Sequence, residues 1–119
     1  MVRDWELVRK ILSSMEARET THGGLDPESI EGYKPEVVSY HIYILQEAGL
    51  IEARCLKSAN APIHCFASSL TWDGHEFLDK IRNETVWAKV KNHIKTKGLD
   101  LSFEVIKIAA TKVIENALS

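Results

Sequence analysis

Hydroxyl-bearing side chains near the middle of the chain could contact nucleic acid. Ser39, Tyr40 and Tyr43 lie in the stretch KPEVVSYHIYILQEAGLI, residues 34–51. Their hydroxyl groups can donate or accept hydrogen bonds at base edges in the major groove. Lys34, at the start of the stretch, could meet a phosphate. We therefore expect these four side chains to face solvent or a partner.

The segment that follows adds three polar residues suited to a nucleic-acid backbone. Arg54, Lys57 and Asn60 fall on the first arm and the tip of a predicted hairpin, where they could enter the minor groove or clamp phosphates. Roughly three phosphate contacts per copy would give weak binding at physiological salt. Useful affinity therefore suggests a homodimer on two half-sites about one helical turn apart.

Two cysteines, Cys55 and Cys65, are the candidates for redox or metal chemistry. Structural zinc usually needs four ligands with closely spaced cysteines, and His64 should point away from Cys65 on a regular strand. We expect no metal site, and free, partly buried thiols. The alternative is a redox-sensing disulfide across the hairpin. Few cysteines and no signal peptide favour a reducing, cytoplasmic compartment.

Catalytic patterns are missing from the sequence. It contains no glycine-rich phosphate loop and no nucleophile elbow around the serine of GLDPES. The five histidines are scattered, and His41 is expected to be a partly buried hydrogen-bonding side chain. We predict no catalytic residues and no cofactor, and therefore no enzyme.

Size and charge limit the classes of partner. The 119 residues carry a formal net charge of −2, which argues against coating nucleic acid by bulk charge but leaves a local basic surface allowed. Because no window approaches about 20 apolar residues, we expect no membrane span.

One helix with both ends marked must position the central hydroxyl groups. Pro35 suits a first turn, and Gly49 suits the left-handed residue after a last turn. Val38, Ile42 and Leu45 form one apolar stripe at helical spacing.

Other elements surround this helix. A first helix is predicted over residues 3–18, capped by Asp4, and its four basic residues are expected to form a solvated face. Residues 25–33 could be a short helix or an extended piece. The pattern of residues 51–70 predicts a β-hairpin, and a turn near Asn60 would place Cys55 opposite Cys65. The four basic residues of the predicted first helix are Arg3, Arg9, Lys10 and Arg18.

Three more helices are predicted after the hairpin, over residues 71–82 and 85–97 and from Ser102 onward. Trp72 is expected on the apolar face of the first. The lysine-rich segment 89–97 is either a solvated face or an electrostatic footprint for nucleic acid. The last helix has a wide apolar face, which implies packing on the body of the protein or dimerisation.

Two motifs in this order resemble winged helix-turn-helix regulators of the MarR and PadR kind. VVSYHIYILQEAGLIEA, residues 37–53, resembles their recognition helix and first wing strand. FASSLTWDGHEFLDKI, residues 66–81, resembles their second wing strand and following helix. The whole chain also resembles a family of small uncharacterised bacterial proteins, often found in phage-derived segments.

The resemblance implies a mainly α (α+β) winged helix-turn-helix with a two-stranded β-hairpin wing and extra C-terminal helices. Residues 1–82 would form the winged-helix domain and residues 83–119 a helical extension, packed on it or mediating dimerisation. We expect a sequence-specific binder of double-stranded DNA, similar to a transcription regulator. The alternative is a winged helix that binds protein, favoured by the negative net charge, the acidic segment 26–31 and the paired tyrosines.

Overall fold

Two compact units, Met1–His75 and Glu76–Ser119, make up the chain in this computed structural model. The structure describes residues 1–20 and 22–119. These residues form five α-helices, one 3-10 turn and a two-stranded antiparallel hairpin. The predicted mainly helical, winged-helix-like α+β class is confirmed. The unit boundary falls within α3, and the expected domain division at residue 82 stays a prediction.

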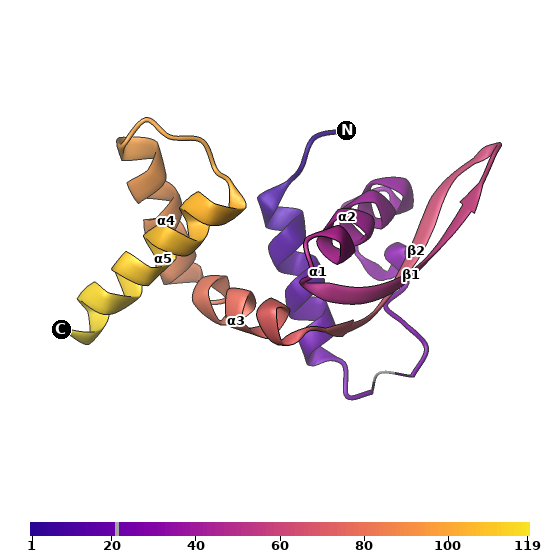
Figure 1. The fold of residues 1–119 in the computed structure, drawn as a ribbon, viewed down its shortest axis with the longest axis horizontal. Helices are drawn as coiled ribbons and strands as arrows, with labels where there is room; N and C mark the ends of the chain where they lie inside the picture. Colours follow the sequence, from indigo (N-terminus) through magenta and orange to yellow (C-terminus); the bar gives the residue numbers. More distant parts are fainter. Residues whose placement is uncertain (21) are drawn as a thin grey trace. The chain divides into compact units, whose positions relative to one another are not determined.

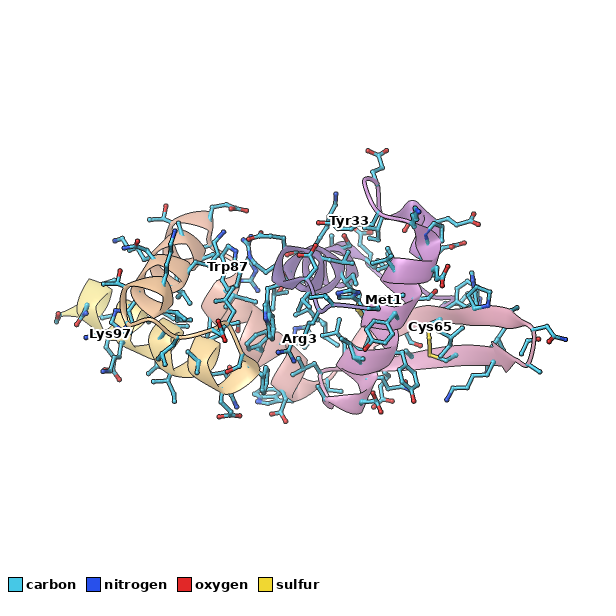
Figure 2. The ribbon with its side chains drawn as sticks, turned by 90° about the horizontal axis from the view of Figure 1, so that it is seen from above. Met1, Arg3, Tyr33, Cys65, Trp87 and Lys97 are labelled. Atoms are coloured by element: carbon cyan, nitrogen blue, oxygen red, sulfur yellow. A yellow bond between two sulfur atoms is a disulfide. The ribbon has the colours of Figure 1, made fainter. Side chains whose placement is uncertain are left out.

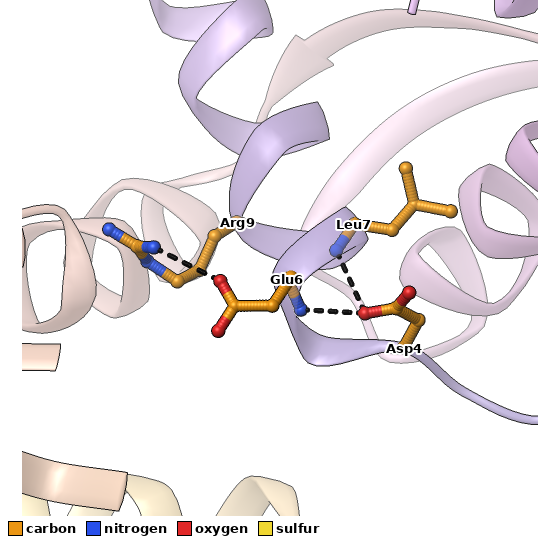
Figure 3. A network of polar contacts seen from close by, with 4 residues as sticks. All are labelled: Asp4, Glu6, Leu7 and Arg9. Atoms are coloured by element: carbon orange, nitrogen blue, oxygen red, sulfur yellow. Dashed lines mark hydrogen bonds and ion pairs between the residues drawn. The ribbon is translucent and has the colours of Figure 1, made fainter. Parts of the chain in front are cut away.

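Helix α1 (Trp5–Ala17) begins at the predicted cap. Asp4 Oδ1 accepts hydrogen bonds from the backbone N–H groups of Glu6, at 2.9 Å, and Leu7, at 3.2 Å (Figure 3). The expectation that Arg9 lies on a solvated face is wrong. Arg9 is one turn beyond the buried Trp5, is itself only 8% exposed, and pairs with Glu6 at 3.4 Å.

The segment before the central helix combines the two structures that the sequence left open. Leu25 is extended and forms an isolated bridge with Ala67. A single 3-10 turn, η1 (Pro27–Ser29), then follows, and Asp26 Oδ1 accepts from the Glu28 N–H at 2.9 Å. The helix prediction therefore holds for one turn and the extended prediction for Leu25.

Helix α2 (Pro35–Glu47) has the predicted ends. Pro35 is its first residue, and Gly49 takes the left-handed conformation with a φ of 79°. Val38, Ile42 and Leu45 are all buried, which confirms the predicted stripe. This stripe fixes which side of α2 faces outward.

The hairpin pairs β1 (Ile51–Ser58) with β2 (Ala61–Leu70), and Figure 1 shows it extending past α2. Cys55 lies opposite Cys65, as the predicted turn required. The expectation of free thiols is wrong, because a disulfide joins the two cysteines (Figure 2). Directly opposed positions on adjacent strands place their Cα atoms 4.1 Å apart, within reach of one bond.

Helices α3 (Trp72–Ile81), α4 (Glu84–Thr96) and α5 (Phe103–Leu118) complete the chain. Within unit 2, α4 and α5 pack together through a core of Trp87, Val90, Ile94, Ile106, Ala109 and Ala110. Asn83 lies between α3 and α4. Its side chain caps α4 by accepting a hydrogen bond from the Val86 N–H at 3.0 Å. Within residues 1–20 and 22–119, no helix is long and apolar enough to cross a membrane.

Trp72 was expected on the apolar face of α3, and this expectation is wrong. Its side chain is 79% exposed, whereas Ile81 is fully buried. Nine residues of helix at 100° each place these two positions on opposite sides of α3.

Candidate interaction surface on α2 and the hairpin

The outward side of α2 carries two tyrosines between two glutamates. Glu36, Tyr40, Tyr43 and Glu47 follow one another at steps of four, three and four residues, which places them on one helical stripe. The glutamates are exposed and the tyrosines half-buried. We call these four residues the α2 outer face.

Ser39 does not belong to this surface, contrary to our expectation. Its side chain is 1% exposed, and its Oγ accepts a hydrogen bond from the Cys65 N–H at 3.1 Å. Position 39 follows the buried Val38 and faces β2, so its hydroxyl group binds the backbone of the hairpin. Ser39 cannot contact a partner while this packing persists.

His41 lies on the inner side of α2 and connects this helix to Asp4, the residue before α1. The residue is fully buried. Its Nε2 accepts from the Asp4 N–H at 2.8 Å, so the ring proton lies on Nδ1, which donates to the Val37 carbonyl at 2.8 Å. The predicted hydrogen-bonding role is confirmed. The link to Asp4 was not foreseen, because it joins residues 37 positions apart.

Two of the predicted site residues meet across elements. Lys57, on β1, places its Nζ 3.5 Å from the Tyr43 hydroxyl and 4.8 Å from the centre of the Tyr43 ring. A cation over an aromatic face is attracted to its electron density. The hairpin arm thus contacts one end of the α2 outer face.

The remaining predicted residues are accessible. Lys34 precedes α2, and its side chain makes no capping hydrogen bond. Lys34, Arg54 and Asn60 are all exposed. Near the far end of α2, Gln46 Oε1 accepts a hydrogen bond from the Ala53 N–H at 2.6 Å. That amide oxygen fixes the hairpin to α2.

Charge around this surface is balanced rather than basic. Residues 34–60 contain three acids and three bases. Glu36 and Glu47 lie on α2, whereas β1 carries Arg54 and Lys57 together with Glu52. Three exposed acids of the preceding segment, Asp26, Glu28 and Glu31, add negative charge before α2. A phosphate backbone laid along α2 would therefore meet like charge.

Metal coordination finds no support in the part of the chain that the structure describes. No group of three or more histidine, cysteine, aspartate or glutamate side chains there could hold a metal ion. The expected absence of catalytic residues and cofactors stays a prediction.

Comparison with known proteins finds a matching family and a relative that aligns with the whole chain. A family described as "Hypothetical protein (DUF2513)" matches residues 2–100. A protein of Haemophilus influenzae, described as an uncharacterized protein, is 47% identical over 119 residues, and the match covers 100% of both chains. No solved structure matches this chain.

Proposed function

The chain belongs to the DUF2513 family, and from the geometry of its first unit we propose that it is a winged-helix-like module that binds a protein partner through the α2 outer face. The observation that carries this proposal is the pair Tyr40 and Tyr43 between Glu36 and Glu47. Tyrosine is enriched at protein interfaces because it offers apolar area together with a polar tip.

The surface also indicates the chemistry of the partner. Two exposed glutamates at the ends of the stripe favour basic groups, and two half-buried rings between them favour apolar ones. Ser39 and His41 tie α2 to two different elements, so the helix presents this stripe from a fixed position. A partner with apolar side chains flanked by lysine or arginine fits these features.

Several finer expectations belong to this proposal. The order of α1, η1, α2 and the hairpin supports a winged helix-turn-helix core in which the first helix of the helix-turn-helix pair is reduced to the single turn η1. A module of this kind would act in the cytoplasm, without catalytic activity, as a monomer or a homodimer.

Duplex DNA is the second candidate, favoured by the exposed bases Lys34, Arg54 and Lys57. In that case α2 would enter the major groove, the hairpin would contact the backbone, and Asn60 would lie at its tip. Affinity for DNA should then fall with added salt, and Lys57→Ala should reduce the logarithmic salt slope by about one. Binding that is indifferent to salt in both proteins would reject this candidate.

The proposal is tested by affinity purification from nuclease-treated host extract with quantitative mass spectrometry. We expect a specific protein to be retained by the wild type and lost by at least about 30-fold in Tyr40→Ala/Tyr43→Ala, as for central interface residues. Tyr33→Ala is the matched control, because Tyr33 is a half-buried tyrosine outside the α2 outer face. Identical retained proteins in wild type and double variant would contradict the proposal.

A further inference from the structure

The disulfide occupies a position between the fixed and the protruding parts of the hairpin. Cys65 is fully buried, whereas Cys55 is half-buried on β1. Residues 56–62, beyond the disulfide, are all exposed. Figure 2 shows the sulfur–sulfur bond crossing between the two strands. Cys65 is therefore enclosed by the core, and Cys55 is the more accessible of the two cysteines.

This bond is connected to both sides of α2. On the inner side, the Cys65 N–H donates to Ser39 Oγ at 3.1 Å. On the outer side, Lys57, two residues beyond Cys55, rests on the Tyr43 ring. A change at the disulfide would thus act on the contact between the hairpin arm and the α2 outer face.

We propose that Cys55–Cys65 is a reversible thiol–disulfide exchange site that reacts with low-molecular-weight thiols of the glutathione class and controls the order of the distal hairpin. The distal hairpin means residues 56–64. Its strand pairing is short and interrupted by a register shift between Leu56 and Ser58. Isolated two-stranded hairpins are marginally stable in water, so this part depends most on the covalent link.

The chemistry follows from the unequal burial of the two cysteines. An incoming thiolate attacks Cys55 Sγ, the sulfur–sulfur bond breaks, and Cys65 leaves as a thiolate that takes up a proton. A second thiol then attacks the outer sulfur of the mixed disulfide and releases Cys55 as a thiol. Two external thiols become one external disulfide, and the protein gains two electrons and two protons. The external disulfide drives the reverse reaction.

Reduction should act on the distal hairpin and leave its base in place. The base is held by Ser39, by Gln46 and by the bridge from Leu25 to Ala67. The distal hairpin is held by its own strand pairing and by the contact of Lys57 with Tyr43. Loss of order there would move Lys57 away from Tyr43 and expose the phenol ring. The effect on partner binding rests on the proposed function, whereas the change in hairpin order does not.

The test uses the full chain, folded, in buffers with varied ratios of reduced to oxidised glutathione. After alkylation, intact mass should show gradual and reversible interconversion, and peptide mass should place the mixed disulfide on Cys55. Amide hydrogen exchange of residues 56–64 should become about tenfold faster or more on reduction, while α1 is unchanged. Cys55→Ser/Cys65→Ala should exchange like the reduced wild type in every buffer.

Three results would overturn the inference. These are a disulfide that resists reduced glutathione until the chain unfolds, reduced thiols that fail to reoxidise, and amide exchange over residues 56–64 that is the same in both states. None of these measurements involves a partner, so their failure is distinct from a failure of the proposed interaction.

Discussion

Three polar side chains of α2 form hydrogen bonds that hold the helix to neighbouring parts of the chain. Ser39 bonds β2, His41 bonds the residue before α1, and Gln46 bonds β1. Each satisfies a backbone N–H group that would otherwise lose a hydrogen bond on folding. These bonds fix the helix in position and leave its tyrosines and glutamates for contacts outside the chain.

Replacing Ser39 by alanine should therefore destabilise the protein without changing its surface. The Cys65 N–H would be left buried without its acceptor, at a cost of about 1–3 kcal/mol in the free energy of unfolding. Urea denaturation followed by circular dichroism measures this. The control is Ser13→Ala, an exposed serine on α1, which should change stability by less than about 0.5 kcal/mol. Equal stabilities for the two variants would refute the role given to Ser39.

Tyr33 should make stability depend on pH in the alkaline range. Burial raises the pKa of its phenol, and the nearby charges of Asp4 and Glu6 raise it further. A pKa that is higher in the folded chain contributes stability that is fully present below the unfolded value of about 10 and is lost as the pH rises through the folded value. Unfolding free energies from pH 8 to 11 should fall less in Tyr33→Phe than in the wild type. Parallel curves would contradict this.

At the scale of elements, the sequence predicted local features better than it predicted contacts between distant residues. Pro35 and Gly49 set the ends of α2, and the turn near Asn60 set the cysteine pairing, because each acts within a few residues. The burial of Ser39 depends on β2, 26 residues away. The polar and apolar pattern of α2 could not reveal which neighbour would cover that side of the helix.

The beginning of α3 lies directly against the residues that follow α2. The Thr71 hydroxyl donates to the Gly49 carbonyl at 2.6 Å and accepts from the Gly74 N–H at 3.1 Å. A Cβ atom on Gly74 would collide with the Leu50 carbonyl oxygen. Only glycine lets α3 begin this close to the end of α2.

Gly74→Ala should accordingly destabilise the protein, although glycine to alanine usually favours a helix by about 1 kcal/mol. We expect a loss of about 1–3 kcal/mol, typical of overpacking, measured by thermal and urea unfolding. Gly32→Ala provides a comparison, because Gly32 has a φ of 86° and open space around its Cβ position. That variant should show backbone strain of about 1–2 kcal/mol without any displacement at Leu50. A Gly74→Ala protein more stable than the wild type would disprove the close approach.

At the scale of the molecule, charge separates the two candidate functions. A formal net charge of −2 says little, since a local basic surface can bind DNA on an acidic protein. The sequence predicted which basic residues would be exposed on the hairpin. It did not predict that the outward stripe of α2 would begin and end with glutamate, because that required the orientation of the helix on the hairpin.

Photo-crosslinking from position 43 in the native host tests the central claim most directly. Tyr43 is replaced by benzoylphenylalanine, with the same replacement at the exposed Lys89 of α4 as the control. The account predicts an adduct at position 43, absent at position 89, that protease removes and nuclease leaves intact. An adduct removed by nuclease, or no adduct beyond that of the control, would contradict it.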